Sequence, residues 1–197
     1  PGDITLGAEN GEFVLRVADD DGEIQLSNFN PADPYASHAV EHYAFSDGTT
    51  FSYDELLQQG LILRGTGSSE FLVGAGGDDV ITGEGGDDLV AGGGGSDTLE
   101  GGLGSDTYVF NLGDGEDTLI DRETFFDSNS IHFGPGIDGS EVHLRVEAGD
   151  LVLAYGGEGD SIRMPGVRPG DPASGGVPFN LMRFADGSTL ALSDLVA

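Results

Sequence analysis

The sequence predicts an all-β fold in which a parallel β-solenoid lies between two β-rich modules. A nine-residue unit repeats without a gap between Gly74 and Val109. Strand-like segments separated by turn signals flank this run, and a longer repeat relates the two ends of the chain. Short strands at regular intervals with turns between them favour an all-β architecture.

The nine-residue unit occurs four times, as GAGGDDVIT, GEGGDDLVA, GGGGSDTLE and GGLGSDTYV. The copies share the pattern G-x-x-G-x-D-x-U-x, where U is apolar. This is close to the known nonapeptide G-G-x-G-x-D-x-U-x of calcium-binding parallel β-helices, from which it is identified. A flexible Gly-rich linker is the alternative for such a composition. A linker has no reason to keep an acid and an apolar residue in phase over four units, so we favour the repeat.

Each unit divides into a turn and a short strand. Positions one to six are Gly-rich, and Gly permits the positive φ angles of a tight turn that points carbonyls inward. Positions seven to nine favour a strand, and alternation directs only the middle one to the core. This predicts an inward column of Ile81, Val90, Leu99 and Tyr108. Two units make one coil, so the turns of units i and i+2 stack on one side.

The acids at position six fit a calcium ion between stacked turns. They are Asp79, Asp88, Asp97 and Asp106. Calcium prefers about 6–8 hard oxygen ligands, and two turns supply carbonyls with one carboxylate each. Without the ion, stacked carboxylates repel and the Gly-rich turns carry a large entropy cost. The acids at position five, Asp78 and Asp87, are expected to face solvent.

The four units resemble the RTX (repeats-in-toxin, haemolysin-type calcium-binding) family over residues 74–109. Degenerate units flank them: residues 65–73 carry Glu70 in place of Asp, and residues 112–120 restore the acid as Asp117 after a two-residue insertion. The run from Asp106 to Asp117 also resembles the way RTX blocks end. The resemblance implies the β-roll form of the solenoid.

The resemblance also implies the ligands. Each ion is held by positions two, four and six of one turn and positions one, three and six of the turn two units later. The first complete site combines Ala75, Gly77, Asp79, Gly92, Gly94 and Asp97. The second complete site combines Glu84, Gly86, Asp88, Gly101, Leu103 and Asp106. A third site joins Thr66, Ser68 and Glu70 to Gly83, Gly85 and Asp88. A fourth joins Gly93, Gly95 and Asp97 to Leu112, Asp114 and Asp117.

The composition excludes several classes of function. The formal net charge is −29 over 197 residues, with 36 acidic and only 7 basic residues. Nucleic acids and anionic membranes are therefore not expected partners, because both require basic patches. The chain has no Cys, so neither disulfides nor thiol chemistry are available. No apolar run is long enough to cross a bilayer, and we find no N-terminal signal peptide.

Other metal and catalytic motifs are weak. His38 and His42 share a side only if they lie on a helix, whereas their segment favours a loop leading into a strand. The acidic run at residues 19–23 lacks the ligand spacing of an EF-hand. No G-x-S-x-G elbow, H-E-x-x-H motif or Cys nucleophile is present, so we do not expect an enzyme.

The longer repeat aligns residues 4–17 with 142–155 at an offset of 138. It resumes one residue later, where F-x-D-G-[TS]-T-[FL] occurs at residues 45–51 and 184–190. We expect flanking modules at 1–64 and 121–197, the second repeating residues 1–57, around an RTX segment at 65–120. The modules resemble the haemolysin-type regions that flank RTX blocks. The first copy begins within a module, so we interpret the chain as a piece of a larger protein with several blocks.

Each module is expected to form strands and hairpins that extend or cap the roll. Residues 12–17 and 150–155 are strand-like, and Ser52 to Glu55 form a capping-box pattern before a short helix. Residues 20–22 and 157–160 indicate hairpin turns, the latter with surplus charge.

The resemblance implies a segment of a large secreted bacterial protein, exported unfolded by type I secretion and folded by extracellular calcium. Its expected partners are calcium ions and adjacent blocks of the parent chain, and direct membrane insertion by this segment is not expected. The alternative is a structural or glycan-binding segment of an RTX adhesin.

Overall fold

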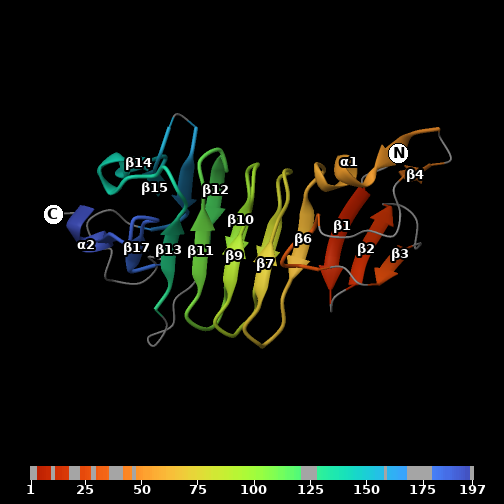
Figure 1. The fold of residues 1–197 in the computed structure, drawn as a ribbon, viewed down its shortest axis with the longest axis horizontal. Helices are drawn as coiled ribbons and strands as arrows, with labels where there is room; N and C mark the ends of the chain where they lie inside the picture. Colours follow the sequence, from red (N-terminus) through yellow and green to blue (C-terminus); the bar gives the residue numbers. More distant parts are fainter. Residues whose placement is uncertain are drawn as a thin grey trace.

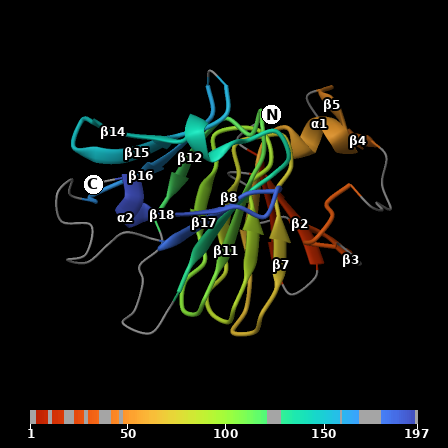
Figure 2. The ribbon, with the colours of Figure 1, turned by 60° about the vertical axis from the view of Figure 1, so that its left-hand side comes forward.

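A computed structural model describes residues 4–9, 12–17, 23–27, 30–35, 42–45, 48–120, 128–157, 159–167 and 179–195. The described chain is almost entirely β, arranged as two facing sheets whose strands run across the long axis of the molecule (Figures 1 and 2). Among the described residues, ten strands form the long sheet and six form the short sheet, while a separate hairpin lies at one end. The predicted all-β solenoid is confirmed.

The central coils alternate between the two sheets. Successive units place β6 (Leu61–Arg64), β8 (Val80–Thr82), β10 (Thr98–Glu100) and β12 (Glu116–Leu119) in the long sheet. The intervening units place β7 (Phe71–Val73), β9 (Leu89–Ala91), β11 (Thr107–Phe110) and β13 (Ser130–Phe133) in the short sheet. All neighbours in these two sets pair in parallel, as two units per coil require.

The core lies between the sheets and follows the predicted column. Ile81, Val90, Leu99 and Tyr108 are fully buried. Ile81 is the register partner of Leu99 in the long sheet, and Val90 that of Tyr108 in the short sheet. The column continues through Leu63 and Leu72 toward the first module and through Leu119 and Ile131 toward the second. Since each coil contributes one apolar residue per sheet, the coils stack without a break in the core.

The modules extend the sheets rather than forming separate bodies. In the first, β1 (Ile4–Glu9), β2 (Glu12–Val17) and β3 (Glu23–Ser27) continue the long sheet from β6. In the second, β16 (Ser161–Met164), β15 (Asp150–Ala154) and β14 (His143–Glu147) continue it from β12, after a short 3-10 helix (Gly139–Glu141). β17 (Leu181–Arg183) and β18 (Thr189–Ala191) extend the short sheet from β13. The boundaries at residues 64 and 120 stay a prediction, and strand pairing crosses both.

The longer repeat has matching strand registers in its two copies. Leu6 pairs with Leu15, and Leu144 pairs with Leu153 at the offset of 138. The pairing of β2 with β3 and of β15 with β16 follows the same offset. The hairpin β4 (His42–Ala44) with β5 (Thr50–Ser52) matches β17 with β18 at an offset of 139. The turn at residues 20–22 lies outside the described residues.

Short helices close both modules. Helix α1 (Tyr53–Leu57) begins at Ser52, whose Oγ accepts a hydrogen bond from the Glu55 N–H at 3.2 Å, while the Glu55 carboxylate accepts one from the Ser52 N–H at 2.8 Å. This is the predicted capping box. The helix buries Leu56 and Leu57 completely, so it covers the apolar core beside β6. Its counterpart α2 (Leu192–Leu195) follows β18.

Candidate metal centre

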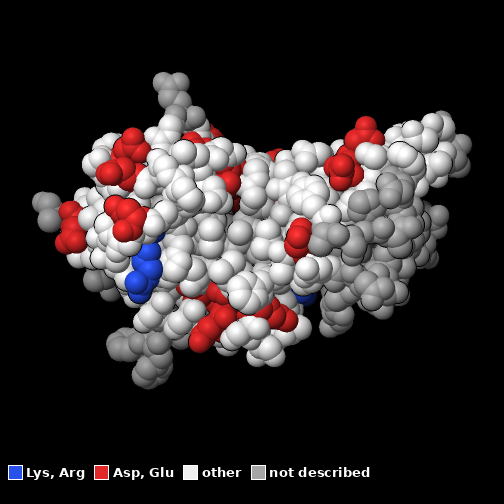
Figure 3. Space-filling view, viewed as in Figure 1, with Lys and Arg blue, Asp and Glu red and all other residues white. Residues whose placement is uncertain are grey.

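The turns of the repeats form two stacks, one at each edge of the two sheets. The first turn stack comprises residues 74–79, 92–97 and 112–117, which lead from the short sheet into the long sheet. The second turn stack comprises residues 65–70, 83–88 and 101–106, which lead in the opposite direction. Acidic side chains gather in groups at the rim of the molecule, while the middle of the visible face carries few (Figure 3).

The position-six acids of the first turn stack form a ladder. Oδ1 of Asp79 accepts a hydrogen bond from the Leu61 N–H at 2.5 Å. Oδ1 of Asp97 accepts one from the Asp79 N–H at 2.7 Å, and Oδ1 of Asp117 accepts one from the Asp97 N–H at 3.0 Å. Each carboxylate therefore accepts a hydrogen bond from the backbone of the preceding coil, and all three residues are at most 2% exposed.

The second turn stack repeats this ladder with different ends. Oδ1 of Asp88 accepts from the Glu70 N–H at 2.8 Å, and Oδ1 of Asp106 accepts from the Asp88 N–H at 2.8 Å. The Asp106 N–H then donates to Oδ1 of Asn129 at 2.7 Å, so a neutral amide replaces the next carboxylate. Sequence reasoning missed Asn129, although Asn129 to His132 keep the pattern of positions six to nine after a longer interval in the sequence.

The other carboxylate oxygen of each ladder acid, Oδ2, shows whether a cation fits at this position. Oδ2 of Asp79 accepts from the Ala75 N–H at 2.5 Å. Oδ2 of Asp88 and of Asp97 are buried, and no hydrogen-bond donor within the described residues reaches either. A buried carboxylate oxygen without a donor costs several kcal/mol, roughly, unless a positive charge compensates it. These atoms therefore suit a bound cation.

Carbonyl oxygens converge on the same carboxylates because position one is Gly. A Cβ added to Gly74 would collide with both Oδ2 of Asp79 and the carbonyl of Gly92. A Cβ added to Gly83 would collide with Oδ2 of Asp88 and the carbonyl of Gly101. Each carboxylate thus lies beside the position-one carbonyl of the turn two units later, and hard oxygens of this kind are the ligands that calcium prefers.

Four copies of the RTX calcium-binding nonapeptide repeat match this region, over residues 64–99, 73–108 and 86–119. Residues 64–119 are an RTX calcium-binding repeat block. No curated protein matches the chain. Among the described residues, no helix is both long and apolar enough to span a membrane.

The structure brings the turns of both complete RTX sites together. In the first, Gly94 N–H donates to the Ala75 carbonyl at 3.0 Å, which stacks residues 74–79 on 92–97. In the second, Leu103 N–H donates to the Glu84 carbonyl at 3.1 Å. A carbonyl oxygen has two lone pairs, so each of these bonds leaves one for a cation. The individual ligands stay a prediction.

The third site differs because Glu70 is one methylene longer than Asp. Its Oε2 accepts from the Thr66 N–H at 2.6 Å, and its Oε1 accepts from the Thr66 Oγ1 at 2.8 Å. The side chain therefore folds back onto its own turn. Its turn still stacks on the next one, since the Gly85 N–H donates to the Thr66 carbonyl at 3.1 Å.

The fourth site retains its stacking despite the insertion. β11 lengthens by one residue to include Phe110, and Thr98 then pairs with Thr118 in the long sheet. The Gly95 N–H donates to the Asp114 carbonyl at 2.8 Å. The Asp114 carboxylate accepts from the Asn111 N–H at 2.6 Å, so the inserted residue is held within the turn.

Asp160 corrects the expectation of a surplus charge at residues 157–160. It is 8% exposed, and its carboxylate accepts from the Gly113 N–H at 2.9 Å and the Gly115 N–H at 3.2 Å. β16 pairs with β12 two residues out of step with the RTX register, since Ser161 lies opposite Glu116. This shift places Asp160 against the glycine amides rather than opposite Asp117.

Burial raises the pKa of the ladder carboxylates. The pKa is about 6 for Asp79 and Asp88, about 7 for Asp97 and about 8 for Asp117. Desolvation is the main cause, backbone N–H groups oppose it, and neighbouring carboxylates add to it. The charged form of these acids is therefore disfavoured until a cation binds.

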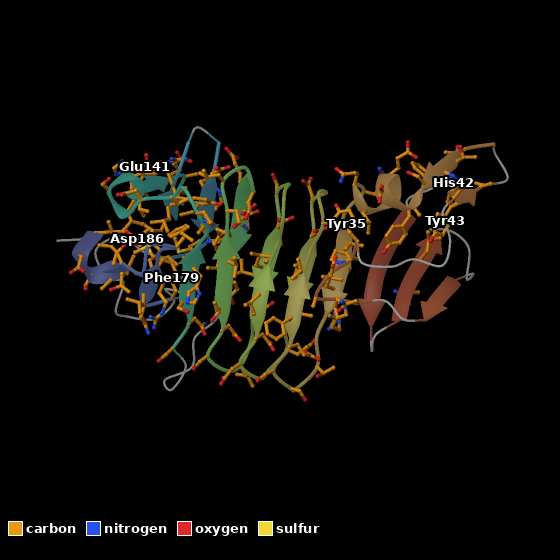
Figure 4. All side chains as sticks on the ribbon, viewed as in Figure 1. Tyr35, His42, Tyr43, Glu141, Phe179 and Asp186 are labelled. Atoms are coloured by element: carbon orange, nitrogen blue, oxygen red, sulfur yellow. The ribbon has the colours of Figure 1, made fainter. Side chains whose placement is uncertain are left out.

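Other candidate residues take no part in the two ladders. Asp78 and Asp87 are exposed, as expected, and each accepts a hydrogen bond at 2.8 Å from a Ser N–H of the turn two units later. His42 is exposed on β4 beside Tyr43, at the end of the molecule beyond the RTX block (Figure 4). Within the described residues, no group of three or more His, Cys, Asp or Glu side chains is placed to hold a metal. A carbonyl-rich site does not require such a group.

Proposed function

We propose that this chain is a calcium-binding β-roll segment that folds when calcium occupies its turn stacks. The buried Oδ2 atoms of Asp88 and Asp97, without hydrogen-bond donors among the described residues, carry this proposal. Each lies in the middle of its stack, where the family pattern assigns it to two consecutive sites. The residues proposed to hold the ions are those of the two complete sites and, at the edges, the third and fourth.

The proposed setting is a large secreted bacterial protein exported by type I secretion. Extracellular calcium modules bind with a Kd of about 10⁻⁴–10⁻³ M, so low cytosolic calcium leaves such sites unfilled. A site at ten times its Kd adds about 1.4 kcal/mol, so several sites together decide a marginal fold. The RTX family and the net charge of −29 support this setting. The role we propose is non-catalytic.

A structural segment of an RTX adhesin is the second candidate. It is supported by the long sheet, in which strand pairing continues from the first module through the RTX block into the second. Such continuity suits a spacer that transmits load. Glycan binding is tested separately by a glycan array on the calcium-loaded chain.

Calcium titration by calorimetry, combined with far-UV circular dichroism, tests the proposal. The chain in chelator should lack most of its β signal and gain it with calcium, while binding at least about two ions. Identical spectra with and without calcium contradict calcium-dependent folding. Fewer than two ions per folded chain contradict the two complete sites.

A further inference from the structure

Each module contains a three-stranded antiparallel meander, and the two copies pair with the RTX block through opposite edges of that meander. In the first copy, β1 pairs in parallel with β6, the entry strand of the RTX block, and β3 ends the long sheet. In the second copy, β16 pairs in parallel with β12, the exit strand, and β14 ends the long sheet. β14 is the equivalent of β1, and β16 is the equivalent of β3. Within the described residues, each edge that lacks a neighbour in one copy is therefore paired in the other.

The hairpin turn between β14 and β15 determines which backbone groups β14 presents at its outer edge. Ala148 (φ 53°) and Gly149 (φ 98°) form a two-residue turn with positive φ at both positions, so Glu147 and Asp150 are a hydrogen-bonded pair. Backbone N–H and carbonyl groups of successive residues point to opposite sides of a strand, so those of Arg145 point toward β15. The N–H groups of Leu144 and Val146 then point away from the sheet. Val146 is 51% exposed.

β6 presents the complementary groups to β1. The Leu61 N–H donates to Asp79 and the Gly65 N–H to the Thr82 carbonyl, so both point toward β8. By alternation, the N–H groups of Ile62 and Arg64 point toward β1. Ile62 lies opposite Gly7, whose equivalent in β14 is Arg145. An entry strand can therefore pair with β14 in the register that β6 adopts on β1.

We infer that the outer edge of β14 is a docking edge for the entry strand of a further calcium-binding block, and that the module joins successive blocks into one sheet. α1 leads from β5 directly to β6, and its counterpart α2 lies at the same end of the molecule as β14 (Figure 1). Arg145 Nε binds Glu147 Oε1 at 2.6 Å on β14 itself. This exposed pair disfavours indiscriminate pairing of the edge while leaving its backbone groups accessible.

The experiment lengthens the intact chain by appending a second copy of residues 59–197 after Ala197. This spacing lets an entry strand follow α2 at the interval at which β6 follows α1. Amide hydrogen exchange is measured with calcium in the original and lengthened chains. The Leu144 and Val146 amides are expected to exchange at least about tenfold more slowly in the lengthened chain. Equal exchange rates, with both chains folded in calcium, overturn the inference.

Val146→Pro provides a matched variant. Proline is tolerated on an edge strand where its nitrogen faces solvent, so the original chain should keep its melting temperature and its calcium response. In the lengthened chain the same substitution should return Leu144 to fast exchange, whereas Val146→Thr should preserve the protection. If Val146→Pro destabilises the original chain as much as the lengthened one, the N–H is used internally and the inference fails. Calcium-dependent dichroism of the original chain reports on the proposed function independently.

Discussion

The two turn stacks of the RTX block share one repeat but differ in the charge of their ladders. The first stack carries Asp79, Asp97 and Asp117, and its last turn also contacts the Asp160 carboxylate. The second begins with Glu70, which bends back onto its own turn, and ends against the neutral amide of Asn129. Negative charge therefore accumulates along the first stack and is limited in the second, so we expect the first to depend more strongly on calcium.

The largest effect is expected at Gly74, the position-one glycine of the first turn in the first stack. Gly74→Ala places a Cβ against Asp79 Oδ2 and the Gly92 carbonyl and should cost about 3 kcal/mol of unfolding free energy. Gly67→Ala is the control, because a Cβ there meets nothing within 4 Å. Urea unfolding in calcium measures both. Equal stability of the two variants would show that position one tolerates a side chain.

Neutralising the middle of each stack compares their dependence on calcium. Asp97→Asn keeps an acceptor for the Asp79 N–H but removes a charge shared by two predicted sites, so calcium affinity should fall about tenfold or more. Asp88→Asn is the counterpart in the second stack and should have a smaller effect, because Glu70 already weakens the site beside it. Calorimetric titration of both variants is the measurement, and unchanged affinity in Asp97→Asn counts against the assigned ligands.

The pH dependence without calcium follows from the raised pKa values. Asp97 and Asp117 have pKa values of about 7 and about 8 in the folded chain, above the value near 4 of an unfolded Asp. The folded state thus binds protons more tightly, so its stability should rise as the pH falls from about 8 toward 4. Calcium requires ionised carboxylates and should reverse the trend. The β signal of the chain in chelator, recorded by dichroism from about pH 8 down to about pH 5, tests this, and a larger signal at about pH 8 than at about pH 5 would refute it.

Exchanging the terminal residues of the two ladders tests whether charge distinguishes the stacks. Asp117→Asn gives the first stack a neutral end and should stabilise the calcium-free chain by about 1 kcal/mol while preserving an acceptor for the Asp97 N–H. Asn129→Asp adds a charge to the second stack and should have the opposite sign. Thermal melts at a series of low calcium concentrations, extrapolated to zero calcium, measure both. Shifts of the same sign would mean that charge does not distinguish the stacks.

The smallest effect is expected on the exposed rim. Asp78→Asn retains an acceptor for the Ser96 N–H and should change the unfolding free energy by no more than about 0.5 kcal/mol. Its calcium stoichiometry should match that of the unmodified chain. If this variant bound one calcium ion fewer on titration, Asp78 would belong to the metal centre.

The periodic part of the fold follows from local sequence. Ile81, Val90, Leu99 and Tyr108 occupy the predicted column because the strand and turn periods are fixed within each nonapeptide. The ends of the ladders could not be derived this way. Asn129 and Asp160 follow sequence that breaks the nonapeptide pattern, so their stacking partners depend on sheet register rather than on the repeat. For Asp160 the register is shifted by two residues, which changes its partner without moving any side chain to the other face of the sheet.

The long axis of the molecule also sets its response to mechanical load. Strands run across that axis, so the hydrogen bonds between neighbouring coils lie along it and carry tension in series (Figure 1). Pulling on the two modules therefore separates coils one at a time instead of shearing whole strands past one another. Each coil of the regular block holds 18 residues, the separation of successive ladder partners, and would release about 60 Å of chain. The segment would therefore lengthen in steps of one coil.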